Sequence, residues 1–174
     1  MEFEPAMRRL ALLLIPLLVL AAPAAAKDSL GVFDDWGAFR DGQVPRCYAI
    51  SAASPEVRSN RANRPTQAAF ASIGTWPKRG VRSQLHVRLS RLVPANAVIS
   101  LTIGGQRFEL IGAGGDAWAK DRKMDAAVVA AMRSAPNLSV TARDVSGRRF
   151  TDRYNLAGAA TAMDAATVGC AKLT

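Results

Sequence analysis

Residues 99–111 read Ile-Ser-Leu-Thr-Ile-Gly-Gly-Gln-Arg-Phe-Glu-Leu-Ile, two short alternating segments joined by two glycines. Alternation of apolar and polar residues is typical of half-buried strands, and paired glycines supply the positive φ angles that a tight hairpin turn requires. Pairing across this turn predicts that Leu101 lies opposite Phe108 and that Ile99 lies opposite Leu110. All four side chains then point to one face, which we expect to be buried in the core.

The same two-residue period recurs on both sides of this hairpin. Leu85, Val87 and Leu89 alternate with polar residues, and a second predicted hairpin joins residues 138–143 to 149–156 through a turn at 144–147. Further strands are expected at residues 32–39, 46–51 and 68–76, and an exposed loop at 55–66.

One alanine-rich segment has the three-to-four-residue period of a helix. It covers residues 124–133 and is stopped by Pro136, and a shorter helical turn is expected at 159–166. Many short strands with one or two short helices indicate a mainly β protein, an antiparallel β-sandwich.

Residues 1–26 have the layout of a secretory signal peptide. Arg8 and Arg9 precede an uncharged apolar stretch at 10–20, and small residues follow up to Ala26 in an A-x-A pattern. A membrane-spanning helix needs about 20 apolar residues, so the stretch is too short for an anchor. We therefore expect cleavage after Ala26 and a periplasmic, secreted or cell-surface location.

The mature chain, residues 27–174, has the length of a single domain. Its two cysteines, Cys47 and Cys170, would meet an oxidising compartment, which favours a disulfide between them; two free buried thiols are the alternative. No transmembrane segment is expected after cleavage. Whether Met1 or Met7 starts the chain stays open.

The balance of charge is strongly basic. The chain has 23 Lys and Arg against 14 Asp and Glu, a net charge of +9. The two acidic and two basic residues of the leader cancel, so the mature domain keeps this charge. Such a charge favours anionic partners, and export argues against nucleic acid. Anionic lipid, another envelope polyanion and an acidic protein remain candidates, and a solvated surface that aids solubility is the alternative.

The basic residues gather around two predicted strands. Arg88 lies on the outward phase of one strand, with Lys78 and Arg79 shortly before it, and Arg149 and Arg153 lie on the outward phase of another. If these strands share a sheet, the five side chains form a basic face. Guanidinium groups suit phosphate and carboxylate ligands, so this face is the candidate anion-binding site.

No arrangement of residues indicates catalysis, a metal or a cofactor. His86 is the only histidine, points away from the predicted core face and has no G-x-S-x-G motif to serve. Asp34 and Asp35 are adjacent in a predicted strand and would point to opposite faces. The acidic residues around Trp118 lack the spacing of a calcium loop; they are Asp116, Asp121 and Asp125.

Asp152 stands out among the polar residues. It is in register with Phe150 and Tyr154 on the predicted inner face, where a carboxylate must be paired or hydrogen-bonded. A structural role, with an arginine or backbone N–H groups as partners, and a role in a pocket are both open.

Two further features have structural and functional interpretations. The glycine-rich residues 112–115 are expected to form a flexible loop, because the lysine of a phosphate-binding loop is missing. The tryptophans are expected in the core, with a carbohydrate-binding platform as the alternative; they are Trp36, Trp76 and Trp118.

The order of several short motifs resembles the invasion-associated locus B family of exported alphaproteobacterial proteins. The motifs are Asp35-Trp36, Cys47-Tyr48, residues 101–108, Ala117-Trp118, the alanine-rich helix leading to residues 138–140, and residues 152–158. The resemblance covers nearly all of the mature chain and implies an immunoglobulin-like β-sandwich. Residues 37–40, after the first of these tryptophans, contain no cysteine, so the family's disulfide arrangement is not carried over.

These observations together favour a non-enzymatic binding or interaction protein of the bacterial envelope. The family resemblance adds no molecular activity, because most members have none known and a fold does not fix a function. An envelope-polymer hydrolase with an unrecognised active site and a structural subunit of an envelope assembly are the alternatives.

Overall fold

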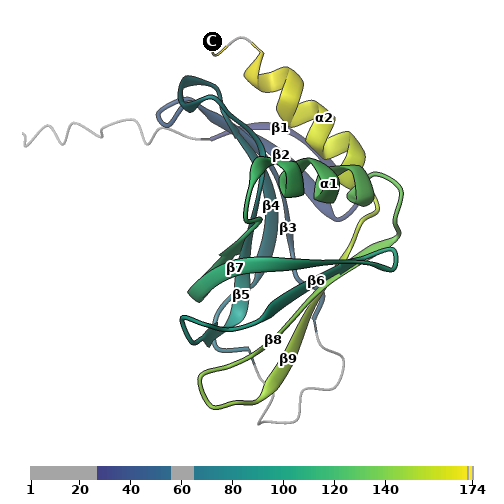
Figure 1. Ribbon diagram of the computed structural model, residues 1–174. Coiled ribbons are helices and arrows are strands. Elements are labelled where there is room, and N and C mark those ends of the chain that lie inside the picture. Colours follow the sequence, from purple (N-terminus) through teal and green to yellow (C-terminus); the bar gives the residue numbers. More distant parts are fainter. Residues whose placement is uncertain (1–26, 56–64, 172, 174) are drawn as a thin grey trace, which may run out of the picture.

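The computed structural model describes residues 27–55, 65–171 and 173 (Figure 1). These residues form nine antiparallel strands and two α-helices, which confirms the predicted mainly β, sandwich-like fold. The elements are β1 (Asp28–Phe33), β2 (Trp36–Asp41), β3 (Arg46–Ala52), β4 (Phe70–Trp76), β5 (Val81–Val93), β6 (Ile99–Ile103), β7 (Gln106–Trp118), α1 (Arg122–Met132), β8 (Asn137–Arg143), β9 (Arg149–Asn155) and α2 (Ala159–Cys170). The predicted leader and most of the predicted loop at 55–66 lie outside the described residues.

The strands follow one another in the order β1-β2-β3-β4-β5-β7-β6-β8-β9. We call β1–β5 with the second half of β7 sheet A, and the first half of β7 with β6, β8 and β9 sheet B. Inner side chains of both sheets belong to one hydrophobic core. Because the two sheets share this core, their outer faces point in different directions.

The strand β7 belongs to both sheets, so the predicted loop at 112–115 is wrong. Gly112 and Gly114 lie where the strand passes from sheet B to sheet A. Gly114 has a φ of +61°, and a Cβ on Gly112 would collide with the carbonyl oxygen of Asp116. Glycine therefore permits a bend that other residues would resist.

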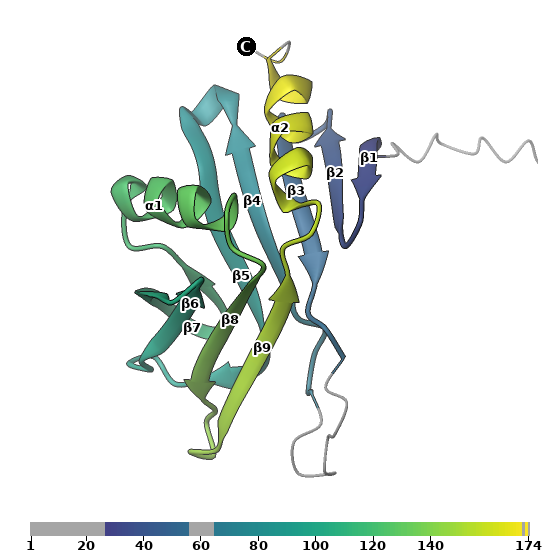
Figure 2. The ribbon, with the colours of Figure 1, turned by 90° about the vertical axis from the view of Figure 1, so that its right-hand side faces the viewer.

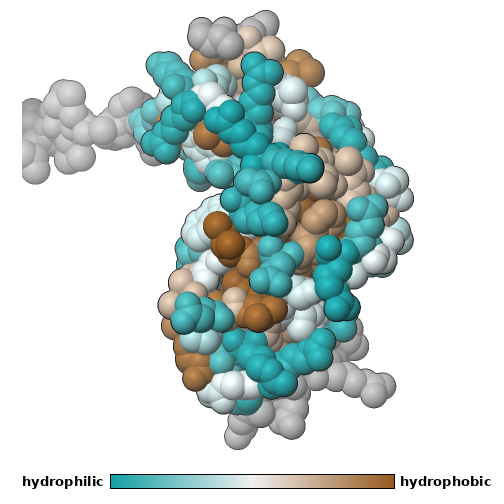
Figure 3. Space-filling view, viewed as in Figure 1, coloured by the Kyte–Doolittle hydropathy of each residue, from teal (hydrophilic) through white to brown (hydrophobic). Residues whose placement is uncertain are grey.

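The predicted hairpins have the expected registers. Leu101 lies opposite Phe108 and Ile99 opposite Leu110, and β8 pairs with β9 across the turn at 144–147. Phe108, however, is only half-buried, and the first half of β7 is an edge strand of sheet B. Hydrophobic residues reach the surface over β6 and β7 below α1 (Figure 3).

The predicted strand at 32–39 is in fact a hairpin. Phe33 pairs with Trp36, so Asp34 and Asp35 are the two turn residues between β1 and β2. Asp34 has a φ of +48°, a conformation that aspartate tolerates better than most residues. The turn was hidden because apolar residues continue on both sides of it.

The helices complete the layer that faces sheet A. Figure 2 shows α1 and α2 above sheet B, in front of β3–β5. The predicted helix at 124–133 is confirmed as α1, and the short turn expected at 159–166 is the longer helix α2, which packs on β1–β4. Neither of these two helices is long and apolar enough to cross a membrane.

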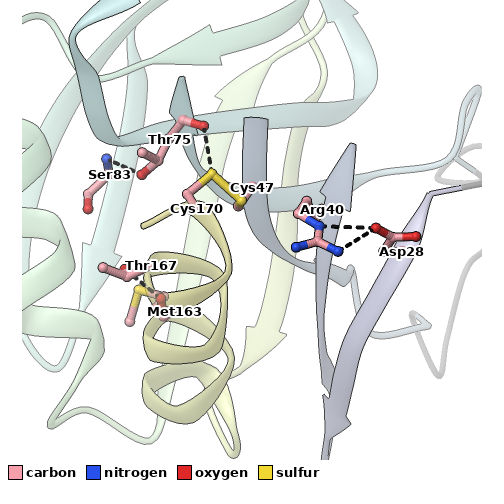
Figure 4. The surroundings of a disulfide bond; sticks show 8 residues. All are labelled: Asp28, Arg40, Cys47, Thr75, Ser83, Met163, Thr167 and Cys170. Carbon is pink, nitrogen blue, oxygen red and sulfur yellow. Dashed lines mark hydrogen bonds and ion pairs between the residues drawn. A yellow bond between two sulfur atoms is a disulfide. The ribbon is translucent and has the colours of Figure 1, made fainter. Parts of the chain in front are cut away.

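The predicted disulfide is confirmed. Cys47 on β3 and Cys170 at the end of α2 are bonded, with their Cα atoms 5.6 Å apart (Figure 4). The bond fastens the last helix to an early strand.

Candidate functional site

The predicted basic residues lie on three separate surfaces. Arg88 is on the outer face of sheet A, whereas Arg149 and Arg153 are on the outer face of sheet B. Lys78 and Arg79 form part of the 3₁₀ turn Pro77–Arg79 between β4 and β5, at the end of the molecule opposite the β8–β9 turn (Figures 1 and 2). The strands of Arg88 and Arg149 belong to one bent sheet, but the bend separates their side chains.

The outer face of sheet B combines arginines with small hydroxyl side chains. We call it the arginine–hydroxyl face; its members are Arg107, Arg143, Arg149, Arg153, Ser100, Thr102, Ser139, Thr141 and Thr151. Thr141 and Thr151 lie opposite each other with their hydroxyl oxygens 2.9 Å apart. Among the described residues of this face, Glu109 is the only carboxylate.

Two like charges are directly opposed on this face. Arg143 at the end of β8 pairs in register with Arg149 at the start of β9. Arg143 donates a hydrogen bond to the Gly147 carbonyl at 2.9 Å, while neither Arg149 nor Arg153 forms an ion pair with any described residue. Like charges directly across a strand pair are destabilising, so this arrangement lowers the stability of the folded protein.

Two grooves flank Arg153. One, of about 880 Å³, is lined by Ser139, Thr151 and Arg153 together with Ser54 and Asn155. The second, of about 510 Å³, lies on the other side of β9, and its lining includes Arg149. The Arg153 guanidinium can therefore reach a ligand in either groove, and the Arg149 guanidinium can reach one in the second groove.

Asp152 lines the second groove, but its carboxylate forms a buried hydrogen bond that stabilises the fold. Its Oδ2 accepts a hydrogen bond from the Ser90 N–H at 2.9 Å, and the side chain is buried. The carboxylate thus ties β9 to the bend in β5. Burial raises the pKa of the neighbouring Tyr154 hydroxyl, and the Asp152 charge raises it further.

Sequence reasoning missed a buried ion pair next to this face. Arg91 Nη1 lies 3.1 Å from Asp144 Oδ2, and the Arg91 side chain is 4% exposed. Hydrogen bonds from the Ser146 hydroxyl and from the backbone N–H groups of Arg148 and Ser146, with Arg91 in addition, lower the pKa of Asp144. The sequence does indicate that Arg91 is buried, since it follows Leu89 at a spacing of two and so lies on the inner phase of the strand.

His86 points away from the core, as its alternation predicts, and it has close neighbours on the outer face of sheet A. His86 Nε2 lies 2.8 Å from Asp116 Oδ1, and Arg88 Nε lies 3.1 Å from the same oxygen. The imidazole stacks on Trp118, with ring centroids 5.2 Å apart, and meets the edge of Phe70. The bend in β7 brings Asp116 and Trp118 to this face, which strand alternation could not show.

The tryptophans and the remaining acidic residues have separate roles. Trp36 is buried in the core and donates from its indole nitrogen to the Asn155 carbonyl, whereas Trp76 and Trp118 lie outside the core. Asp121 caps α1, and Asp125 Oδ1 accepts from the Leu85 N–H, with burial raising the pKa of Asp125. In the described part of the chain, no three metal-ligating side chains come together.

Comparison with known proteins gives one match, to a solved structure. No family model matches the chain, and no curated protein matches it either. The crystal structure of invasion associated protein B from Bartonella henselae superposes with a TM-score of 0.53 over 82% of this chain and 96% of that one. The two chains share a fold. Their sequence identity is 12%, so the likeness concerns architecture alone.

Proposed function

We propose that this chain is an exported, non-enzymatic binding protein of the bacterial envelope, related to the invasion-associated locus B proteins, that holds anionic envelope components on its arginine–hydroxyl face. The opposed pair of Arg143 and Arg149, with Arg153 beside two grooves, is the observation that carries the proposal.

A bound anion would relieve the repulsion on this face. Two guanidinium groups on neighbouring strands can share one phosphate or carboxylate, and Arg forms charge-assisted hydrogen bonds with such groups. The hydroxyls of Thr141 and Thr151 lie alongside and can donate to further oxygens. The single negative charge of Glu109 does not balance the four arginines of this face, so the face keeps a net positive charge that attracts anions.

Export is supported by the predicted leader and by the disulfide. A bond between Cys47 and Cys170 is typical of proteins that work in an oxidising compartment. The fold shared with invasion associated protein B is consistent with relationship to that family.

A non-enzymatic role is supported by the surroundings of the only histidine. The imidazole of His86 contacts Asp116, Trp118 and Phe70, and no Ser, Thr or Cys side chain of the described residues is hydrogen-bonded to it. A nucleophile within reach of a base is what hydrolysis by a side chain would need.

Co-sedimentation with lipid vesicles tests the proposal. The mature protein should bind phosphatidylcholine vesicles that contain phosphatidylglycerol, and it should bind pure phosphatidylcholine vesicles little. Added salt should release it, because exposed charges are screened over about 10 Å at 0.1 M. Soluble polyphosphate should compete if the phosphate group is recognised, and should fail to compete if the face requires a lipid surface. Equal binding to neutral vesicles, or no binding at low salt, would contradict the proposal.

A further inference from the structure

Trp118 is the most exposed aromatic residue in the described ranges, with 36% of its surface open to solvent. It is the last residue of β7, and the second half of β7 is the edge strand of sheet A. One face of its ring stacks on His86, at an interplanar angle of 16°. The ring is therefore held from one side and is accessible from the other.

The neighbours of Trp118 fix the ring in place. His86, against which it lies, is itself held by Asp116 at 2.8 Å and by the edge of Phe70 at 5.4 Å between centroids. An aromatic surface that is already ordered loses little conformational entropy when a ligand binds.

Polar groups of both kinds lie beside the ring. Asp116 Oδ1 accepts from His86 and pairs with Arg88, which leaves Oδ2 without a partner among the described residues. The Arg88 side chain is 39% exposed and uses its Nε for this contact, so its terminal N–H groups can donate elsewhere. A carboxylate acceptor and a guanidinium donor thus stand next to an apolar ring.

The charge of this cluster argues against an anionic ligand. Arg88 and Asp116 neutralise each other, in contrast to the arginine–hydroxyl face on the other sheet. The outer phase of the flanking strands also carries no exposed aliphatic side chain near the ring; it presents Phe70, Ser72 and Gln84. An apolar protein surface would find little aliphatic area to cover here.

We infer that Trp118, Asp116 and Arg88 form a binding site for a neutral hexose unit of a glycan. The apolar C–H face of a sugar ring suits the open face of the indole, and vicinal hydroxyls can donate to Asp116 and accept from Arg88. The two-sided chemistry of a neutral sugar matches this combination of groups better than an anion or an aliphatic side chain does. The glycines at 112–115 serve the site by bending β7 so that Asp116 and Trp118 reach sheet A.

Affinity electrophoresis tests this inference. The mature protein, which runs toward the cathode because of its net charge of +9, is run in native gels cast with dextran, mannan or galactan. At least one of these neutral polymers should retard it. Trp118→Ala and Asp116→Asn should each weaken retardation, Trp118→Ala by at least about tenfold, which corresponds to about 1.4 kcal/mol. Trp118→Phe keeps an aromatic face and should retain part of the binding.

The matched control is the variant with Arg149→Gln and Arg153→Gln, which leaves the Trp118 site intact. It should be retarded like the wild type, and thermal unfolding should show that all variants are folded. Absence of retardation by all three polymers, or full retardation of Trp118→Ala, would overturn the inference. The inference would also be overturned if the protein bound no polymer but self-associated, and Trp118→Ala abolished the self-association. The ring would then be a protein contact. None of these outcomes bears on the vesicle binding proposed for sheet B.

Discussion

Arg143 and Arg149 occupy directly opposed positions on β8 and β9, so two exposed positive charges meet where the hairpin closes. A pair of this kind costs stability in the free protein and becomes favourable when an anion lies between the two groups. Stability and binding should therefore respond in opposite directions to its removal.

We expect Arg149→Gln to stabilise the free protein at low salt. Removing one charge relieves a cross-strand repulsion of about 0.2–1 kcal/mol, while the hydrogen bond from Arg143 to Gly147 is kept. Thermal unfolding at low ionic strength should show a higher Tm for the variant, and the difference should shrink in 1 M salt. A lower Tm at low salt would show that Arg149 makes favourable contacts that this structure does not contain.

Asp144 should make stability depend on acid. Its pKa is lowered in the folded protein by the Ser146 hydroxyl, by backbone N–H groups and by Arg91. Such a carboxylate contributes stability that is fully present above its unfolded pKa, about 4, and is lost as pH falls through the lower folded pKa. At pH 7, Asp144→Asn should unfold at a lower temperature than the wild type, because buried Arg91 loses its counter-charge. The Tm gap between the two proteins should narrow as pH falls below about 4, and a gap that stays constant would contradict this role.

The disulfide should supply much of the stability. The bond between Cys47 and Cys170 spans 123 residues of sequence, and loop-closure entropy sets an upper value of about 4–5 kcal/mol for its contribution. Chemical denaturation of the double variant Cys47→Ala and Cys170→Ala should show a loss of this order. The reduced wild type should unfold at a denaturant midpoint similar to that of the double variant. A midpoint equal to that of the oxidised wild type would mean that α2 is held by packing alone.

Asp152 should act on stability and leave binding unchanged. Asp152→Ala leaves the Ser90 N–H without its buried acceptor, which should cost about 1–3 kcal/mol in the free energy of unfolding. Vesicle binding per folded molecule should match the wild type. Loss of binding at unchanged stability would instead show that the Asp152 carboxylate takes part in anion binding.

Local patterns were enough to predict the strands and their pairing within hairpins. Leu101 and Leu138 are buried as their alternation indicates, because one face of each strand packs on the core. The turn at Asp34 could not be predicted, since apolar residues continue on either side of it and no local residue pattern requires the chain to turn there. Residues 112–115, three of them glycines, resemble a loop in composition, and only the continuation of pairing on both sides identifies a bent strand.

The candidate sites depend on long-range geometry that alternation does not contain. Arg88 and Arg149 share an outward phase, but phase does not say that the sheet bends between their strands and separates them. In the same way, Asp116 is 30 residues from His86 in sequence and reaches it only because β7 crosses between sheets. How the predicted basic residues are distributed over separate surfaces could be seen only in the structure.

The proposal is that anions bind to the arginine–hydroxyl face itself and are not simply attracted by the net charge of the chain. Two variants of equal net charge separate these possibilities: one with Arg143, Arg149 and Arg153 replaced by Gln, and one with Lys78, Arg79 and Arg82 replaced by Gln at the opposite end of the molecule. Binding of both to phosphatidylglycerol vesicles should be measured at one low salt concentration. The first variant should lose most of its binding, and the second should bind nearly as well as the wild type. Equal loss in both variants, or binding that survives in the first, would mean that the arginine–hydroxyl face is not the anion-binding site.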